Sequence, residues 1–142
     1  MKKRIAHIVD DDPDILDSVS FILRSRDIAT TTHPSSEAFL EALPGLEPGC
    51  IILDIAMPGM NGLQLQAHLH RHGCHMPVII ITGHADITSA VTAMKEGALD
   101  FIQKPFTKEE LFGAVEAAWT ELDRPSLDPE QCERARQLVA RL

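Results

Sequence analysis

Polar side chains stand at the ends of four apolar stretches in this sequence, and their types suit one kind of chemistry when taken together. The carboxyl ends of parallel strands lie along one edge of a sheet, so side chains that end such stretches can converge there. A single aspartate at the end of a strand more often ends the strand or caps a turn, and the prediction therefore depends on all four positions. These are the pair Asp10 and Asp11, then Asp54, Thr82 and Lys104.

The residue types at these positions favour phosphoryl transfer to a carboxylate. Asp11 and Asp54 are hard oxygen ligands suited to a Mg²⁺ that keeps several waters. Asp10 is expected to support these ligands without binding the ion itself, or to bind it through a water. Crowded carboxylates raise one another's pKa, and bound Mg²⁺ would leave Asp54 ionised and nucleophilic. The positive charge of Lys104 and the hydroxyl of Thr82 suit the equatorial oxygens of a transferring phosphoryl group. The predicted product is an aspartyl phosphate at Asp54.

The elements that must position these residues alternate between strand and helix along the chain. Apolar and β-branched runs predict strands over 4–9, 28–33, 50–54, 78–82 and 99–103, the second of them nearer a sheet edge. Apolar residues at helical spacing predict helices from Pro13 to about Arg26, after the caps Ser35 and Asn61, over 87–96, and from Thr107 to 122. This alternation is typical of an α/β fold in which a doubly wound parallel sheet of five strands carries helices on both faces.

Length, charge and cysteine pattern limit the classes of function. The 142 residues carry a formal net charge of -8, and the acidic and basic side chains after residue 124 cancel. A domain this acidic is a poor direct DNA binder, because phosphate contacts need Lys and Arg. No apolar run is long enough to span a membrane, and no signal peptide is evident. The three cysteines have no paired spacing, which indicates reduced thiols and a cytoplasmic protein.

We expect residues 1–123 to form this domain and residues 124–142 to form a linker and the start of a helix. Arg124-Pro125-Ser126 is typical of a linker, and apolar residues recur at helical spacing from Cys132 to Leu142. The segment is either a C-terminal helix docked on the domain or a linker helix cut off before a second domain. We favour the second interpretation.

Four motifs, in this order and at this spacing, resemble those of response-regulator receiver domains, the phospho-acceptor half of two-component signalling. They are Ile8-Val9-Asp10-Asp11-Asp12, Leu53-Asp54-Ile55-Ala56-Met57-Pro58-Gly59, Ile81-Thr82-Gly83-His84 and Phe101-Ile102-Gln103-Lys104-Pro105-Phe106. The resemblance covers residues 4–122, and 82–86 and 100–106 are most similar to the FixJ-type subgroup, whose members carry a C-terminal LuxR-type helix-turn-helix. It implies the flavodoxin-like strand order 2-1-3-4-5, and contact with DNA only through an output domain missing from this chain.

The resemblance also implies roles for individual residues. Asp54 accepts a phosphoryl group from a histidine kinase, Thr82 and Phe101 form the switch pair, and the Lys104-Pro105 bond is cis. Phosphorylation is then expected to alter the outer face of the helix over 87–96 and the strand over 99–103. We expect a phosphorylation-dependent homodimer through these two elements.

The loop after Asp54 departs from the family pattern. Ala56 stands where a longer side chain is usual, although its backbone carbonyl is still expected to join Asp11 and Asp54 as a Mg²⁺ ligand. The short side chain leaves the phosphate more open to water, which affects its lifetime. His84 could shield the phosphate or position a water, or it could simply form loop surface.

Two other classes of function stay open at this point. One is a stand-alone receiver that acts by binding other proteins. The other is a Mg²⁺-dependent phosphohydrolase, which normally carries a second acid two residues after its nucleophile, where this chain has Ala56. We therefore expect a switch that catalyses only its own phosphorylation and dephosphorylation. His68, His72 and His75 could bind a transition metal, although such a cluster is more typical of a solvated helix face.

Overall fold

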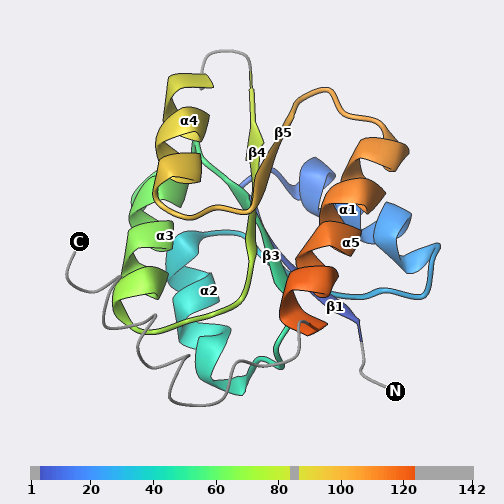
Figure 1. Ribbon diagram of the computed structural model, residues 1–142, viewed down its shortest axis with the longest axis horizontal. Helices are drawn as coiled ribbons and strands as arrows, with labels where there is room; N and C mark the ends of the chain where they lie inside the picture. Colours follow the sequence, from blue (N-terminus) through green and yellow to red (C-terminus); the bar gives the residue numbers. More distant parts are fainter. Residues whose placement is uncertain (1–3, 84–86, 124–142) are drawn as a thin grey trace.

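The computed structural model describes residues 4–83 and 87–123, which form a parallel sheet flanked by helices (Figure 1). The strands are β1 (Ile5–Val9), β2 (Ala29–His33), β3 (Cys50–Asp54), β4 (Val78–Thr82) and β5 (Asp100–Gln103). The helices are α1 (Pro13–Arg24), α2 (Ser36–Ala42), α3 (Gly62–Arg71), α4 (Ile87–Lys95) and α5 (Lys108–Asp123), with a 3₁₀ turn η1 (Leu43–Gly45) after α2. The expected linker and helix over 124–142 lie outside the described residues, as does His84.

All neighbouring strands pair in parallel, in the order β2-β1-β3-β4-β5. The predicted fold class and strand order are therefore confirmed, and β2 is an edge strand as expected. The register places Asp54 beside Ile81 and Thr82 beside Gln103. The ends of β3, β4 and β5 thus lie next to one another, which is the arrangement that the site requires.

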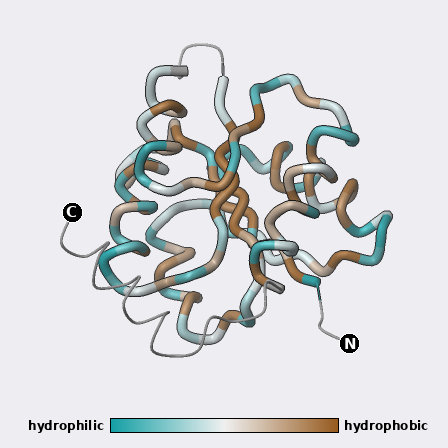
Figure 2. The backbone as a smooth tube through the Cα atoms, in the orientation of Figure 1, coloured by the Kyte–Doolittle hydropathy of each residue, from teal (hydrophilic) through white to brown (hydrophobic). Residues whose placement is uncertain are grey.

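Two apolar layers enclose the sheet, one on each face. α1 and α5 cover one face and α2, α3 and α4 cover the other, as Figure 1 shows. The β3 and β4 residues are buried throughout, because both of their faces carry helices, and the hydrophobic colouring in Figure 2 is concentrated along the central strands. Such two-sided burial is what their uninterrupted apolar sequence predicts. No helix among the described residues is both long and apolar enough to cross a membrane.

Local capping explains where the helices begin and end. The Asp12 side chain accepts a hydrogen bond from the Asp14 N–H at the start of α1, and Asn61 and Gln64 form a reciprocal capping box at the start of α3. The expected end of α1 at about Arg26 is two residues late. The helix ends at Arg24 because the chain turns there, and Asp27 adopts a left-handed φ of 62°.

Candidate functional site

Asp54 is the last residue of β3, and the fold brings a cation and a second carboxylate to it. The residue is 6% exposed. The Nζ atom of Lys104 lies 3.7 Å from Asp54 Oδ1 and 3.6 Å from Asp10 Oδ2. Residues from three separate strand ends therefore meet at one point, as their positions in the sequence predict.

Asp10, Asp11 and Asp54 form the acidic part of the site. One carboxylate oxygen from each lies within 4.8 Å of the others. Asp10 is buried, with Oδ1 accepting from the Asp12 N–H at 2.9 Å, while its Oδ2 atom has the Lys104 ammonium at 3.6 Å but no hydrogen bond. Three carboxylates that share one ammonium offer several hard oxygen ligands, which fits a small divalent cation such as Mg²⁺. These residues are thus suited to the metal that the sequence predicts.

The electrostatics of the site oppose ionisation of its acids when no metal is bound. Burial raises the pKa of Asp54 to about 6, and the neighbouring charge of Asp10 adds to this increase. The Lys104 ammonium and the Ala56 N–H, which hydrogen-bonds the Asp54 carboxylate, act in the opposite direction. Burial also raises the pKa of Asp10 above its usual range, partly offset by the Asp12 N–H and Lys104. One lysine does not compensate for three clustered carboxylates.

Thr82 connects the acidic site to β5. Its side chain is fully buried and its hydroxyl donates to the Gly83 carbonyl at 3.1 Å. The Lys104 N–H donates to the Thr82 carbonyl at 2.8 Å, so the site lysine is joined through its own backbone to the end of β4. The Lys104–Pro105 peptide bond is cis, as expected. Phe101, the other predicted switch residue, is 38% exposed on β5.

The loop over residues 55–61, here called the acceptor loop, follows Asp54 directly. Ala56 is exposed, so its methyl group provides little cover for the site. Met57 is buried against the layer that contains α2, α3 and α4. The loop ends where the Gly62 N–H donates to the Ile55 carbonyl at 2.9 Å. A Cβ atom at Gly62 would collide with the backbone of Asp54, so only glycine permits α3 to begin this close to Asp54.

The structure also reveals a contact to this loop that the sequence analysis missed. Oε1 of Glu37, in the first turn of α2, accepts a hydrogen bond from the Met60 N–H at 3.0 Å. The two residues are 23 positions apart, and no local pattern links them. An acidic residue in a first helical turn is itself common, so nothing in the sequence marked Glu37 as more than a helix-stabilising charge.

Two buried histidines were also missed. Thr31 Oγ1 lies 2.7 Å from His7 Nδ1 and 2.8 Å from His33 Nε2, and His7 Nε2 lies 2.8 Å from the Glu47 carbonyl. That carbonyl can only accept, so Nε2 of His7 must carry a proton. Burial lowers the pKa of both histidines, and His7 contributes to the lowering at His33. The His33 carbonyl in turn accepts from the Asp10 N–H at 3.1 Å, next to the acidic cluster.

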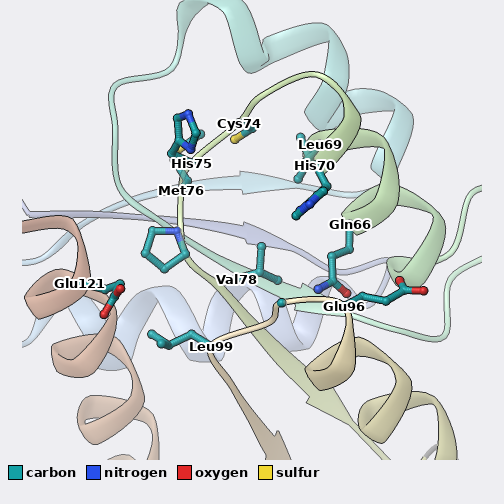
Figure 3. A pocket seen from close by; sticks show the side chains of 12 residues that line it. Gln66, Leu69, His70, Cys74, His75, Met76, Val78, Glu96, Leu99 and Glu121 are labelled. Atoms are coloured by element: carbon teal, nitrogen blue, oxygen red, sulfur yellow. The ribbon is translucent and has the colours of Figure 1, made fainter. Parts of the chain in front are cut away.

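The other histidines singled out in the sequence, His68, His72 and His75, lie on α3 and in the segment that follows it. The rings of His68 and His72 stack with centroids 4.1 Å apart, and His72 Nδ1 bonds the His68 carbonyl. A cavity of about 230 Å³ lies at the amino-terminal ends of β4 and β5, where His75 is among its lining residues (Figure 3). Among the described residues, the only group of three or more His, Cys, Asp or Glu side chains within metal-binding distance is the aspartate cluster.

Known proteins are similar to this chain in both sequence and fold. The family model for the response regulator receiver domain matches residues 6–116. Transcriptional regulatory protein FixJ of Azorhizobium caulinodans is 46% identical over 112 residues, which are 79% of this chain and 53% of that protein. Response regulator protein TmoT of Ectopseudomonas mendocina is 41% identical over 137 residues, 96% of this chain and 60% of that protein. The chain thus spans little more than half the length of these relatives.

Two solved structures extend the likeness to three dimensions. The crystal structure of FixJ-N has a TM-score of 0.80 and 38% identity, and the match covers 89% of this chain and 100% of that one. Full-length FixJ from B. japonicum has a TM-score of 0.81 and 36% identity, with coverage of 95% and 64%.

Proposed function

The chain belongs to the response-regulator receiver family, and from this premise we propose that Asp54 accepts a phosphoryl group from a histidine kinase in the cytoplasm. The observation that carries the proposal is the meeting of the Lys104 ammonium with the carboxylates of Asp10 and Asp54, at 3.6 and 3.7 Å. Both carboxylates are buried and face the cation from different strands. This is an arrangement for neutralising charge that is added to Asp54.

The transfer itself is an in-line displacement at phosphorus. An ionised oxygen of Asp54 attacks the phosphorus of a phosphohistidine, and the new O–P bond forms as the P–N bond breaks. The imidazole leaves with the bonding electron pair: a ring already protonated on its other nitrogen departs as neutral imidazole, and an unprotonated ring becomes neutral by taking a proton from solvent. The Lys104 ammonium, already beside the acceptor, interacts with the charge on the transferred oxygens, and the Thr82 hydroxyl can donate to them by leaving its bond to the Gly83 carbonyl.

We assign Mg²⁺ to the aspartate cluster. Asp11, Asp54 and the Ala56 carbonyl would hold the ion, with Asp10 outside them orienting bound water. When bound, the cation supplies positive charge to the phosphoryl oxygens and favours the ionised form of Asp54. The clustering of three carboxylates around the single Lys104 ammonium supports this assignment, because a divalent cation would offset the negative charge that the lysine leaves uncompensated.

The output follows from the connection between the site and β5. A Thr82 hydroxyl turned toward a phosphate vacates its present position, and Phe101 can turn inward from its exposed position on β5. The surface formed by α4 and β5 would then change, and Val91, 45% exposed on α4, gives that surface an apolar centre. We propose that the phosphorylated form dimerises through this surface and that transcription is regulated through an output domain outside this chain.

Intact-mass spectrometry tests the phosphoryl-transfer proposal. With Mg²⁺ and acetyl phosphate, the wild-type protein is expected to gain one phosphoryl group, and Asp54→Asn none. Asp17→Asn is the matched control, because Asp17 is an exposed carboxylate on α1, and it should be labelled like the wild type. Full labelling of Asp54→Asn would remove Asp54 from its role. Continuous release of phosphate without an accumulating adduct would instead favour a phosphohydrolase.

A further inference from the structure

The side chains of Ile55, Met57 and Met60 hold the acceptor loop against the apolar layer, but the backbone of its outer turn needs a further anchor. The loop has to keep the Ala56 N–H bonded to the Asp54 carboxylate and the Ala56 carbonyl near the expected Mg²⁺ position. Ala56, Pro58 and Gly59 are nevertheless all exposed. Within residues 55–61, the described hydrogen bonds to β4 and α3 secure only the two ends of the loop. Its outermost turn, at Gly59 and Met60, is secured from α2 instead.

Glu37 provides this contact. Its Oε1 atom accepts from the Met60 N–H at 3.0 Å, and that hydrogen bond is the largest cause of a lowered pKa at Glu37. The carboxylate is therefore ionised when it makes the contact, and hydrogen bonds to a charged acceptor are the stronger kind. The Glu37 N–H and the Ser35 hydroxyl also contribute to the lowered pKa of this carboxylate.

Gly59 is shaped for the same contact. Its φ is +73°, a conformation that favours glycine, and a Cβ atom built there would stand 3.0 Å from Glu37 Oε1. Gly59 therefore serves the contact in two ways. It adopts a turn that only glycine adopts easily, and it leaves the approach of the Glu37 carboxylate unblocked. Neither is needed merely to begin α2.

We propose that Glu37 is a positioning residue, which holds the acceptor loop at Met60 and so keeps Ala56 in place beside Asp54 for Mg²⁺ binding and phosphoryl transfer. The inference rests on the function proposed above and deepens it. Glu37 touches neither the acceptor nor the aspartate cluster. It acts through the loop, whose next anchored point toward Asp54 is the buried Met57. Because Ala56 brings no long side chain of its own, the position of its backbone determines what the loop contributes to the site.

Two conservative substitutions separate this role from ordinary helix stabilisation. Glu37→Gln keeps the reach of the side chain and an acceptor oxygen but removes the charge. Glu37→Asp keeps the charge at the helix start but shortens the side chain by one methylene. Positioning predicts the order wild type, then Gln, then Asp and Ala together. Stabilisation through the helix dipole predicts the opposite order for the pair, with Asp like the wild type and Gln like Ala.

Calorimetric titration with Mg²⁺ is the first measurement. Groups that orient metal ligands typically change metal affinity by about 10- to 100-fold when removed, and this single exposed contact should lie at the lower end, with a loss of about tenfold for Glu37→Ala and Glu37→Asp. Glu37→Gln should retain most of the affinity. Asp11→Ala sets the scale for losing a ligand, and Glu41→Ala, an exposed acid on the same helix, should match the wild type.

Amide exchange at Met60, followed by NMR on the metal-free protein, gives a readout that does not depend on the site. Exchange should be at least about tenfold faster in the Asp and Ala variants, since the protecting bond is absent. Mg²⁺ affinities within twofold of the wild type for every Glu37 variant would overturn the inference, as would the order expected for the helix dipole. If Glu37→Ala fails to fold, the Gln and Asp pair decides.

The same series separates the inference from the proposed function. If the wild type and the Glu37 variants bind Mg²⁺ and take up a phosphoryl group equally well, the positioning role alone is refuted. A wild-type protein that neither binds Mg²⁺ nor accepts a phosphoryl group from acetyl phosphate refutes the proposed function, and the positioning role is refuted with it.

Discussion

The aspartate cluster should make the metal-free protein less stable than a variant without the Asp54 charge. Burial and the charge of Asp10 move the pKa of Asp54 from 3.8 to about 6 in the folded state. A tenfold change in an acid constant corresponds to about 1.4 kcal/mol, so the ionised folded form is disfavoured by roughly 3 kcal/mol. Because the site opens to solvent at Asp11 and Ala56, screening reduces the expected effect to about 1–2 kcal/mol. At pH 8 without Mg²⁺, Asp54→Asn should raise the free energy of unfolding by this amount.

The pH dependence of this gain identifies its cause. Below a pH of about 4, Asp54 is protonated in both the folded and the unfolded protein, and the penalty is absent. Between about 4 and 6 the folded state holds the proton more tightly, so the Asp54 contribution to the unfolding free energy falls as pH rises. Above about 6 the full penalty remains. The advantage of Asp54→Asn should therefore appear between these values and then stay constant.

Urea unfolding followed by fluorescence is suited to this measurement, since Trp119 is the single tryptophan and is buried on α5. Asp17→Asn serves as the control for removing an exposed carboxylate. Mg²⁺ at about 100 times its dissociation constant should stabilise the wild type by about 2.7 kcal/mol and offset the advantage of the variant. An equal or lower unfolding free energy for Asp54→Asn at pH 8 would refute the reasoning. An equal gain at pH 4 would assign it to packing of the amide.

Two further predictions concern the buried histidines and the output. Burial lowers the pKa of His7 and His33, so the unfolded chain binds protons that the folded state excludes, and the unfolding free energy should fall as pH drops below their usual value of 6.5. In an Asp54→Asn background, which removes the opposite trend of Asp54, His7→Gln should lose less stability than its parent between pH 7.5 and 5.5, as measured by urea midpoints. Any trend from Asp10 is common to both proteins, so an equal loss would contradict the assignment to His7. Thr82→Ala should still take up a phosphoryl group by intact mass but show no increase in mass by light scattering with beryllofluoride, whereas the wild type dimerises. A Thr82→Ala protein that dimerises like the wild type would place the switch elsewhere.

The sequence predicted those parts of the site that depend on strand ends. An apolar run followed at once by a polar residue places that residue at the edge of a parallel sheet, whatever the details of packing. This is why the positions of Asp54, Thr82 and Lys104 relative to one another could be expected. The end of α1 was predicted less well, because the short turn after Arg24 depends on the left-handed conformation of Asp27 and not on the apolar pattern.

Contacts between distant segments could not be predicted in this way. Glu37 meets Met60 only because α2 and the acceptor loop lie side by side in the folded chain, and His7 reaches a carbonyl 40 residues away. The direction of the Thr82 hydroxyl is another case, since the same residue at the same register could donate to the site or, as here, to the Gly83 carbonyl. Register determines where a side chain lies, whereas its partners depend on packing that the local sequence does not specify.

In the function proposed above, Lys104 links a change of charge at Asp54 to the end of β5. Its ammonium lies beside Asp54 and Asp10, and its backbone N–H is bonded to the Thr82 carbonyl at the end of β4. Extra negative charge on Asp54 attracts the ammonium, and a phosphate also offers an acceptor to the Thr82 hydroxyl. Both responses act on the same pair of neighbouring strand ends, three residues from Phe101. A ligand shifts a conformational equilibrium only through its different affinity for the two states. Here the two residues that would respond to the phosphate, Lys104 and Thr82, are already linked by a hydrogen bond between their backbones. This favours an output surface that includes β5.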